Sequence, residues 1–297
     1  MRILCGVWLA AALCAGQSGK TRKDVLQGIK TPGVQIPFAS LKADAELPLA
    51  PRWMIFSDAI LLPNKAGGLE RLDAKTNKLV GPVAGPRNLC GGAATGFASL
   101  WISDCAAHSL VRLDEKAAAD PKAPARGPKL ADPVSIATGV GSAVPSVAAT
   151  ADSVWILSDD KTTLSRIDPD QNKVVSELRL PAGCNSLTFG ETALWVTCPS
   201  ENLVLRVNPV TTLIEKRIEV PAQPSALVIG ESSLWVLCLK EGKIERIDPK
   251  DEKVVQQFRG AAGGAIFFGQ NSVWLTNVRE GTLWRIDPKR IVATLAE

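Results

Sequence analysis

Tyrosine is absent from the 297-residue chain, and histidine occurs only once, at His108. None of the seven cysteines forms a Cys-x-x-Cys or Cys-x-x-Cys-His motif, and the histidine stands at no zinc-ligand spacing from them. These absences argue against a zinc site and against a covalently attached haem. The longest apolar run, residues 3–15, is too short to span a bilayer. We therefore expect no cofactor and no transmembrane segment.

Several motifs of enzymes and nucleotide-binding proteins are also missing. The chain has no Gly-x-Ser-x-Gly nucleophile elbow, and no Walker or dinucleotide-binding glycine pattern in a suitable context. Acidic pairs such as Asp159-Asp160 do not match a calcium loop. With 34 Lys+Arg against 30 Asp+Glu, the net charge is +4, too small to predict a nucleic-acid-binding surface. We assign no catalytic residue and no metal ligand.

The composition and the N-terminus indicate a folded, exported protein. Hydrophobic residues make up 46% of the chain and charged residues 22%, enough for a substantial core. Arg2, the apolar run that follows it and the small residues near Gly16 predict a signal peptide over residues 1–16. We expect a flexible segment over residues 17–32, a single domain over residues 33–297, and a periplasmic or secreted location. Lipidation of Cys14 is the alternative, although Leu13 is larger than the residue that lipidation signals place there.

Internal repetition is the strongest signal in the chain. A hydrophobic-Trp-hydrophobic phrase occurs five times, and an Arg-hydrophobic-Asp/Asn triplet begins 11 residues after each Trp. A sixth, earlier copy has Ile60 and Arg71 at these positions. Four copies also have a glycine five residues before the Trp. The five pairs are Trp101–Arg112, Trp155–Arg166, Trp195–Arg206, Trp235–Arg246 and Trp274–Arg285, and the glycines are Gly96, Gly190, Gly230 and Gly269. The arginines recur at intervals of 41, 54, 40, 40 and 39 residues, so the period is near 40.

A period near 40 with four short β-rich runs per unit predicts an all-β propeller. Six copies predict six four-stranded blades, with each Trp in the layer between blades; a seventh, eroded blade from residues 31–50 is the alternative. The long interval falls at residues 115–130, which we interpret as a surface loop. The last copy extends to residues 291–295, which we expect to supply its fourth strand. One of the runs 34–41 and 43–47 is expected to pair with the final blade and close the ring.

The repeated Arg-hydrophobic-Asp phrase, often followed by Pro, is interpreted as structural. Aspartate favours the first position of a type I turn, and proline favours the second. We expect the arginine of each copy to reach the backbone or a carboxylate of a neighbouring blade.

Five cysteines follow the predicted signal peptide. Cys90 and Cys184 stand just before a first strand, while Cys105 and Cys198 end the second strand of the same blades. These positions face each other across a hairpin, which predicts the disulfides Cys90–Cys105 and Cys184–Cys198. Cys238 lacks such a partner and is expected to be a free, buried thiol.

The propeller geometry predicts a candidate ligand site at one mouth of the central channel. Residues before each first strand, and the loops between second and third strands, should converge there. Arginines on the first blades favour an anionic or polar ligand, whereas a solvated loop face without a ligand is the alternative. The residues that we expect at this mouth are Arg52, Arg87, Asn88, Asp104, His108, Asn185, Ser186, Asn277 and Arg279.

The phrases at residues 233–236 and 281–288 resemble YVTN-type β-propeller repeats and the repeats of streptogramin B (virginiamycin B) lyases. The resemblance covers about residues 31–297 and implies a propeller fold. The lyases open a cyclic depsipeptide by elimination, with histidines, a glutamate and Mg²⁺. This chain has one histidine, so no residue is carried over to that catalytic set. YVTN-type relatives are similar to cell-surface and periplasmic binding proteins.

Three functions follow from these observations. We expect a monomeric, non-catalytic binding or scaffold module for a protein, glycan or small ligand, with no nucleic-acid partner. A divergent streptogramin B lyase-like enzyme, carrying out Mg²⁺-dependent carbon–oxygen elimination, is the alternative. A redox-partner or quinone-cofactor propeller is the third possibility.

Overall fold

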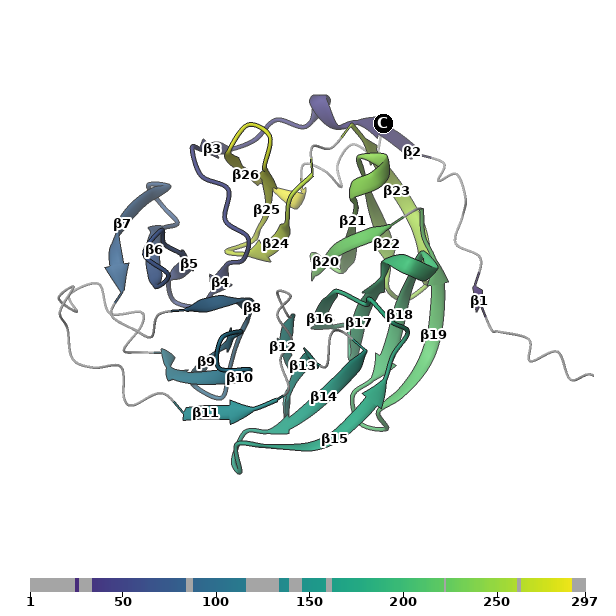
Figure 1. Cartoon of the computed structure of the whole chain (residues 1–297). Coiled ribbons are helices and arrows are strands. Elements are labelled where there is room, and N and C mark those ends of the chain that lie inside the picture. The colour runs from purple at the N-terminus through teal and green to yellow at the C-terminus, as the bar shows by residue number, and fades with distance from the viewer. Residues whose placement is uncertain are drawn as a thin grey trace, which may run out of the picture.

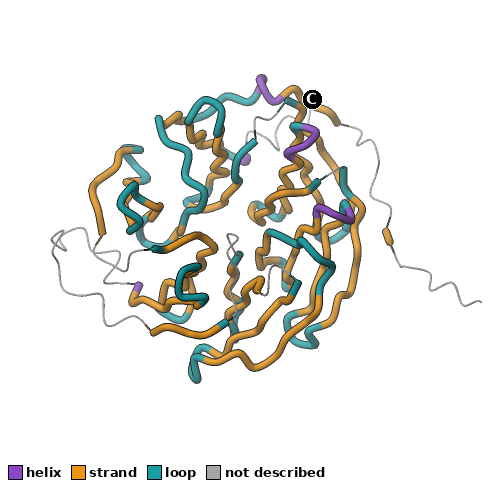
Figure 2. Tube along the Cα trace, viewed as in Figure 1, coloured by secondary structure: helices purple, strands orange, loops and turns teal. Residues whose placement is uncertain are grey.

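The computed structural model describes residues 25–26, 34–83, 88–115, 134–138, 146–158, 162–221, 223–260 and 263–289. Six antiparallel sheets stand around a common axis, and consecutive sheets follow one another around the ring (Figure 1). Strands make up most of the described chain, and helix is confined to short turns (Figure 2). The protein is therefore a six-bladed β-propeller, as the repeat predicted, and the alternative of seven blades was wrong.

Each blade has four strands, counted from the channel outward. They are β4 (Ile55–Phe56), β5 (Ile60–Pro63), β6 (Leu69–Asp73) and β7 (Lys78–Val83) in blade 1; β8 (Leu89–Gly96), β9 (Ser99–Asp104), β10 (Ser109–Asp114) and β11 (Val134–Ala137) in blade 2; β12 (Val147–Ala149), β13 (Val154–Ser158), β14 (Thr163–Asp168) and β15 (Lys173–Arg179) in blade 3; β16 (Ser186–Gly190), β17 (Ala193–Cys198), β18 (Leu203–Asn208) and β19 (Leu213–Glu219) in blade 4; β20 (Pro224–Gly230), β21 (Ser233–Cys238), β22 (Lys243–Asp248) and β23 (Lys253–Arg259) in blade 5; and β24 (Ile266–Gly269), β25 (Ser272–Asn277), β26 (Thr282–Ile286) and β3 (Ala45–Leu47) in blade 6.

The second strand of each blade is the centre of its core. Every residue of β17, β21 and β25 is buried, because these strands lie inside the sheet with a blade on either face. The five repeat tryptophans are at most 1% exposed. Burial of such large rings contributes a few kcal/mol each, so the repeated Trp stabilises the packing between blades.

We expected each repeat arginine to reach a neighbouring blade, and three of the five do so. Arg112 donates to the carbonyl of Pro169 in blade 3, and Arg206 lies 3.8 Å from the Glu252 carboxylate in blade 5. Arg285 donates to the carbonyl of Ala74 in blade 1 at 2.5 Å. Arg166 instead pairs with Asp152 of its own blade. All five guanidinium groups lie over the Trp ring of their own repeat.

The aspartates that follow these arginines form turns, as expected. The Asp168 carboxylate accepts hydrogen bonds from the backbone N–H groups of Asp170 and Gln171, at 2.8 and 3.0 Å. These N–H donors lower the pKa of Asp168 below its usual value. The repeated Arg-Ile-Asp-Pro phrase therefore has a structural role in this fold.

The ring is closed by a strand from the N-terminal segment. β3 pairs antiparallel with β26 through Leu47 and Leu283, so blade 6 combines both ends of the described chain. This confirms that one of the two extended runs closes the propeller. The outer side of β26 is occupied by β3. Residues 291–295, which were expected to supply the fourth strand, lie outside the described residues.

Two further N-terminal strands lie on the outside of the ring. β1 (Val25–Leu26) pairs in parallel with β19, and β2 (Val34–Pro37) pairs in parallel with β23. Blades 4 and 5 therefore have five strands (Figure 1). A short helical turn, Phe38–Ser40, follows β2, and the Phe38 ring stacks on Trp284 with centroids 5.3 Å apart.

The disulfides form as predicted. Cys90–Cys105 and Cys184–Cys198 each join the two innermost strands of one blade. Cys238 is free and buried. Burial and the nearby Glu245 carboxylate raise the pKa of its thiol, so a nucleophilic thiolate is disfavoured.

Candidate functional site: the central channel

The innermost strands of all six blades surround one cavity of about 520 Å³ along the propeller axis. This volume lies within the range of ligand pockets, about 300–1,000 Å³. The lining runs from the residues just before each inner strand to the strand itself, for example from Arg52 to Phe56 in blade 1 and from Asn185 to Phe189 in blade 4. The cavity is thus a channel open to the loops that precede the inner strands.

Side chains of the inner strands alternate between the two adjoining inter-blade layers. In β20, Leu227 packs toward blade 4, whereas Ala226 and Val228 pack toward blade 6. Each inner strand is also the free edge of its sheet, so part of its backbone N–H and C=O groups points toward the axis. The channel wall is therefore formed by main chain to an unusual degree.

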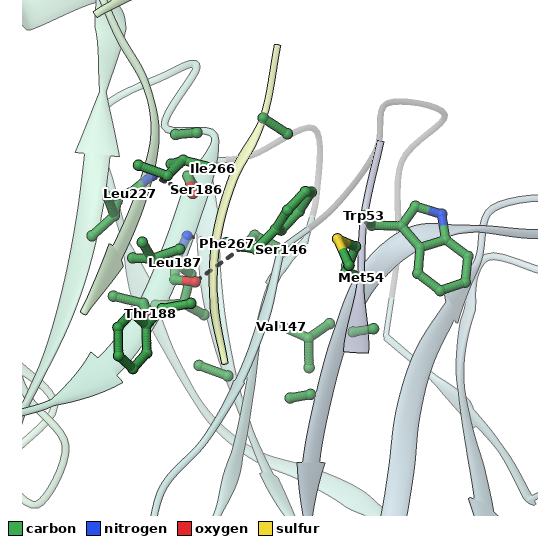
Figure 3. Close-up of a pocket in the computed structure, with 18 of the residues that line it drawn as sticks. Trp53, Met54, Ser146, Val147, Ser186, Leu187, Thr188, Leu227, Ile266 and Phe267 are labelled. Atoms are coloured by element: carbon green, nitrogen blue, oxygen red, sulfur yellow. Dashed lines mark hydrogen bonds between the residues drawn. The ribbon is translucent and has the colours of Figure 1, made fainter. Parts of the chain in front are cut away.

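Serine hydroxyls join neighbouring inner strands across this wall (Figure 3). The Leu187 N–H donates to Ser146 Oγ at 2.9 Å, and Ser146 Oγ donates back to the Leu187 carbonyl at 3.2 Å. One repeat later, the Leu227 N–H donates to Ser186 Oγ at 3.2 Å. These bonds link blades 3, 4 and 5 at the channel and satisfy polar groups that the sheets leave unpaired.

All six blades contribute apolar residues to the wall, including Met54 of blade 1 and Phe267 of blade 6. The side chains of Met54 and Phe267 lie close to each other beside the cavity (Figure 3), and both belong to one apolar cluster. Trp53 points away from them, into the layer that includes Leu61 and Leu100. A thioether and an aromatic ring are well suited to contact an apolar ligand surface.

Charge is scarce in the channel. Among the described residues that line it, Arg52 alone is charged. It is exposed, and within the described part of the chain it has neither a hydrogen bond nor an ion pair. An unpaired guanidinium beside an otherwise uncharged cavity favours an anionic group at that place.

Three of the residues predicted from the sequence line the channel, namely Arg52, Asn185 and Ser186. Asn185 Oδ1 accepts a hydrogen bond from Thr197 Oγ1 at 2.7 Å, which orients its amide. Arg87 lies outside the described residues.

The other five predicted residues are described but do not line the cavity; they are Asn88, Asp104, His108, Asn277 and Arg279. The Asp104 carboxylate accepts hydrogen bonds from the N–H groups of Ala106 and Ala107, and His108 is exposed with a φ of 50°. Asp104, His108, Asn277 and Arg279 lie at turns between second and third strands, which are farther from the axis than the inner strands, whereas Asn88 directly precedes the inner strand β8. All five side chains remain a prediction as ligand contacts.

Met54, Thr188 and Phe267 line the channel but were not predicted. Their position within or beside a first strand could have identified them as wall residues, since every first strand contributes to the channel wall. The prediction named residues that precede the first strands and residues of the loops between second and third strands, and so left out the first strands' own wall residues such as Thr188.

Glu245, whose carboxyl group has a strongly raised pKa, lies in the packing layer between blades and does not line the channel. Glu245 is fully buried, and burial raises its pKa to about 7. One of its oxygens accepts a hydrogen bond from Gln257 Nε2 at 2.5 Å, and the other has no partner among the described residues. Its place in the packing layer favours a structural consequence over a catalytic one.

The described residues contain neither a cluster of metal ligands nor a membrane-spanning helix. No group of three or more His, Cys, Asp or Glu side chains there could hold a metal ion. No helix in the same part of the chain is long and apolar enough to cross a membrane.

Comparisons with known proteins agree on the fold. No family model matches the chain. No curated protein matches it in sequence. Among solved structures, a streptogramin B lyase has 18% sequence identity and a TM-score of 0.55, over 80% of this chain and 94% of the lyase. At this identity the similarity shows a shared fold, and it confirms at that level the resemblance seen in the repeats.

Two other solved structures are more distant. The hydrazine synthase of Kuenenia stuttgartiensis has 13% identity and a TM-score of 0.49, over 64% of this chain and 56% of that one. The glutaminyl cyclase of Myxococcus xanthus has 12% identity and a TM-score of 0.45, over 67% of this chain and 90% of the cyclase.

Proposed function

We propose that this protein is an exported binding module whose central channel takes a small ligand with an apolar body and one anionic group. The observation that carries the proposal is the charge of the channel wall, where Arg52 is the only charged side chain among the described lining residues. A carboxylate is the anion that a guanidinium binds with two parallel hydrogen bonds. Met54 and Phe267 would contact the apolar body.

The rest of the wall supports reversible binding rather than chemistry. Its polar groups are hydroxyls, an amide and main-chain groups, which orient a ligand without transferring protons near neutral pH. The two disulfides support an oxidising compartment such as the periplasm or the extracellular space.

The fold shared with a streptogramin B lyase keeps elimination as the second candidate. Elimination needs a base near the substrate. The single histidine, His108, is exposed and absent from the channel lining, which favours binding over the lyase reaction.

The test compares matched ligands by isothermal titration calorimetry. A series of aryl and alkyl carboxylates is titrated in parallel with the corresponding neutral amides. We expect a carboxylate to bind and its amide to bind at least tenfold more weakly. Arg52→Gln should remove this preference, whereas Arg217→Gln, which deletes the same charge on the outer strand β19 of blade 4, should keep it.

Two results would contradict the proposal. The first is equal binding of acids and amides, and the second is loss of the preference in Arg217→Gln alone. Incubation of intact streptogramin B with the protein and Mg²⁺ tests the second candidate, because ring opening followed by mass spectrometry would establish turnover.

A further inference from the structure

The N-terminal segment shows how this propeller accepts an added strand. β1 and β2 both pair in parallel with the outermost strand of a blade. Leu26 is opposite Ile218 in blade 4, and Ile36 is opposite Phe258 in blade 5. Ile218 and Phe258 occupy equivalent positions, because each pairs with the residue two before its repeat arginine. The two additions therefore share direction and register, with an aliphatic residue at the same place.

β2 adds to the apolar layer between blades 5 and 6. Ile218 is 0% exposed and Phe258 is 1% exposed. Ile36 packs against the cluster that contains Phe258. Ile36 thus extends this inter-blade layer outward by one more strand.

Blade 3 has the same edge without a fifth strand among the described residues. Its outer strand, β15, ends the sheet, and Leu178 occupies the position of Ile218 and Phe258. Leu178 is only partly buried, although it packs against the cluster between blades 3 and 4. The neighbouring Ser176 has a buried Oγ without a hydrogen-bond partner in the described part of the chain.

The other outer edges are less suitable. β7 contains Pro82, which has no N–H, and Gly81 with a φ of 141°. β11 has four residues, and the equivalent Ile136 is already 3% exposed. β3 has three residues. β15 has seven residues and no proline, so it offers the longest continuous ladder of these edges.

We propose that the outer edge of β15 binds an extended segment of a partner polypeptide by parallel strand addition. The segment places an aliphatic residue opposite Leu178 and a hydroxyl or amide side chain two residues earlier, opposite Ser176. Main-chain hydrogen bonds provide the affinity, and these two positions provide the specificity. The described part of the protein's own N-terminal arm, β1 and β2, does not supply it, because these strands pair with blades 4 and 5.

The probe is a fluorescein-labelled peptide of residues 32–41, which contains β2, with Val34 replaced by Thr to place a hydroxyl opposite Ser176. Binding to the protein of residues 17–297, with its own arm present, is followed by fluorescence polarisation. We expect saturable binding that Leu178→Asp weakens at least tenfold. Val80→Asp, on the exposed outer strand of blade 1, should leave it unchanged.

Two N-methylated peptides test the main-chain ladder without altering the protein. Methyl groups on alternate backbone nitrogens block either the N–H groups that face β15 or those that face solvent. We expect one peptide to lose binding and the other to retain it. A photo-reactive version should cross-link within residues 173–179.

Four outcomes would overturn the proposal. The first is no binding of the probe, and the second is equal binding of both N-methylated peptides. The third is cross-linking to β19 or β23, which would mean that the probe displaces the arm. The fourth is concentration-dependent dimerisation that Leu178→Asp abolishes while the probe stays unbound, which would assign the edge to a second copy of the chain.

Discussion

At the scale of single residues, the glycine five residues before each Trp has two roles. Its carbonyl accepts the indole N–H in four blades, at 3.0 to 3.2 Å. It also lies against the next blade, so that a Cβ at Gly230 would be 2.4 Å from the Phe268 ring. Blade 3 has Thr150 at this position, and there the Trp155 N–H has no partner among the described residues. Glycine therefore stands five residues before the Trp because the next blade packs too closely against this position to leave room for a Cβ.

We expect Gly230→Ala to lower the free energy of unfolding by about 2 to 3 kcal/mol, because the added methyl group overpacks the interface between blades 5 and 6. Gly68→Ala is the matched control, since its Cβ would meet Asn64 at an ordinary 3.5 Å. Urea denaturation followed by Trp fluorescence measures both. Equal losses in the two variants would contradict this explanation of the repeat.

The buried Glu245 predicts a pH-dependent stability. Its pKa is raised from 4.5 to about 7 in the folded protein, so the native state holds a proton that the unfolded state releases. The part of the stability that depends on Glu245 is therefore greatest below pH 4.5, falls as the pH rises toward 7 and is constant above it. The loss is about 3 kcal/mol at 1.36 kcal/mol per pKa unit.

Glu245→Gln should remove this part of the pH dependence. We expect the variant to resemble the wild type at pH 5 and to exceed its unfolding free energy by about 3 kcal/mol at pH 8. Glu219→Gln, at an exposed position of β19, serves as the control. The measurement is denaturant unfolding at both pH values. Parallel pH profiles for wild type and Glu245→Gln would show that Glu245 is ionised in the fold.

At the scale of strands and hairpins, the two disulfides join the two innermost strands of blade 2 and of blade 4. Cys184 and Cys198 close a loop with a sequence separation of 14. We expect the double replacement of both by Ser to lower the unfolding free energy by about 3 kcal/mol, since the unfolded chain regains the entropy of an open loop. Cys238→Ala provides a comparison without a lost cross-link. A loss no larger than in Cys238→Ala would contradict the estimate.

The elements predicted from the sequence are those that repeat. The Trp and Arg positions located the second and third strands, and hairpin geometry then gave both cysteine pairs correctly. β1 was not recognised, and the extended run 34–41 contains β2 without predicting its pairing with β23. Segments of two and four residues carry no periodicity and pair with strands about 190 to 220 positions away. The channel wall was predicted only in part. Phe267 and Met54 look like ordinary core residues until the ring places them beside the axis.

At the scale of the whole molecule, the ring depends on contacts between its two ends. Leu47 of β3 covers Leu283, and Asp44 accepts a hydrogen bond from the Asp287 N–H at 2.8 Å. Arg285 continues this connection into blade 1. Phe38 stacks on Trp284 from the outside. Blades 6 and 1 are therefore held together by residues from the N-terminal segment as well as by their own packing.

Two truncations separate closure of the ring from the added outer strands. Removal of residues 1–33 deletes β1 only, and we expect a folded monomer with a small loss of stability. Removal of residues 1–48 also deletes β2, Phe38 and β3, which exposes β26 and the Trp284 ring. The buried side chains of Phe38 and Leu47 are then missing from the core, and each loss lowers the free energy of unfolding by about 2 to 3 kcal/mol. Together this is a large fraction of the roughly 5–15 kcal/mol that stabilises most domains.

We therefore expect the longer truncation to unfold at a much lower denaturant concentration and to aggregate through its open sheet edge. Size-exclusion chromatography and urea unfolding compare both proteins with residues 17–297. Addition of a peptide of residues 34–50 should restore the monomer of the longer truncation, because the missing strand can pair in trans. If both truncations behave alike, closure does not depend on β3, and the packing of blades 1 and 6 against each other suffices to hold the ring.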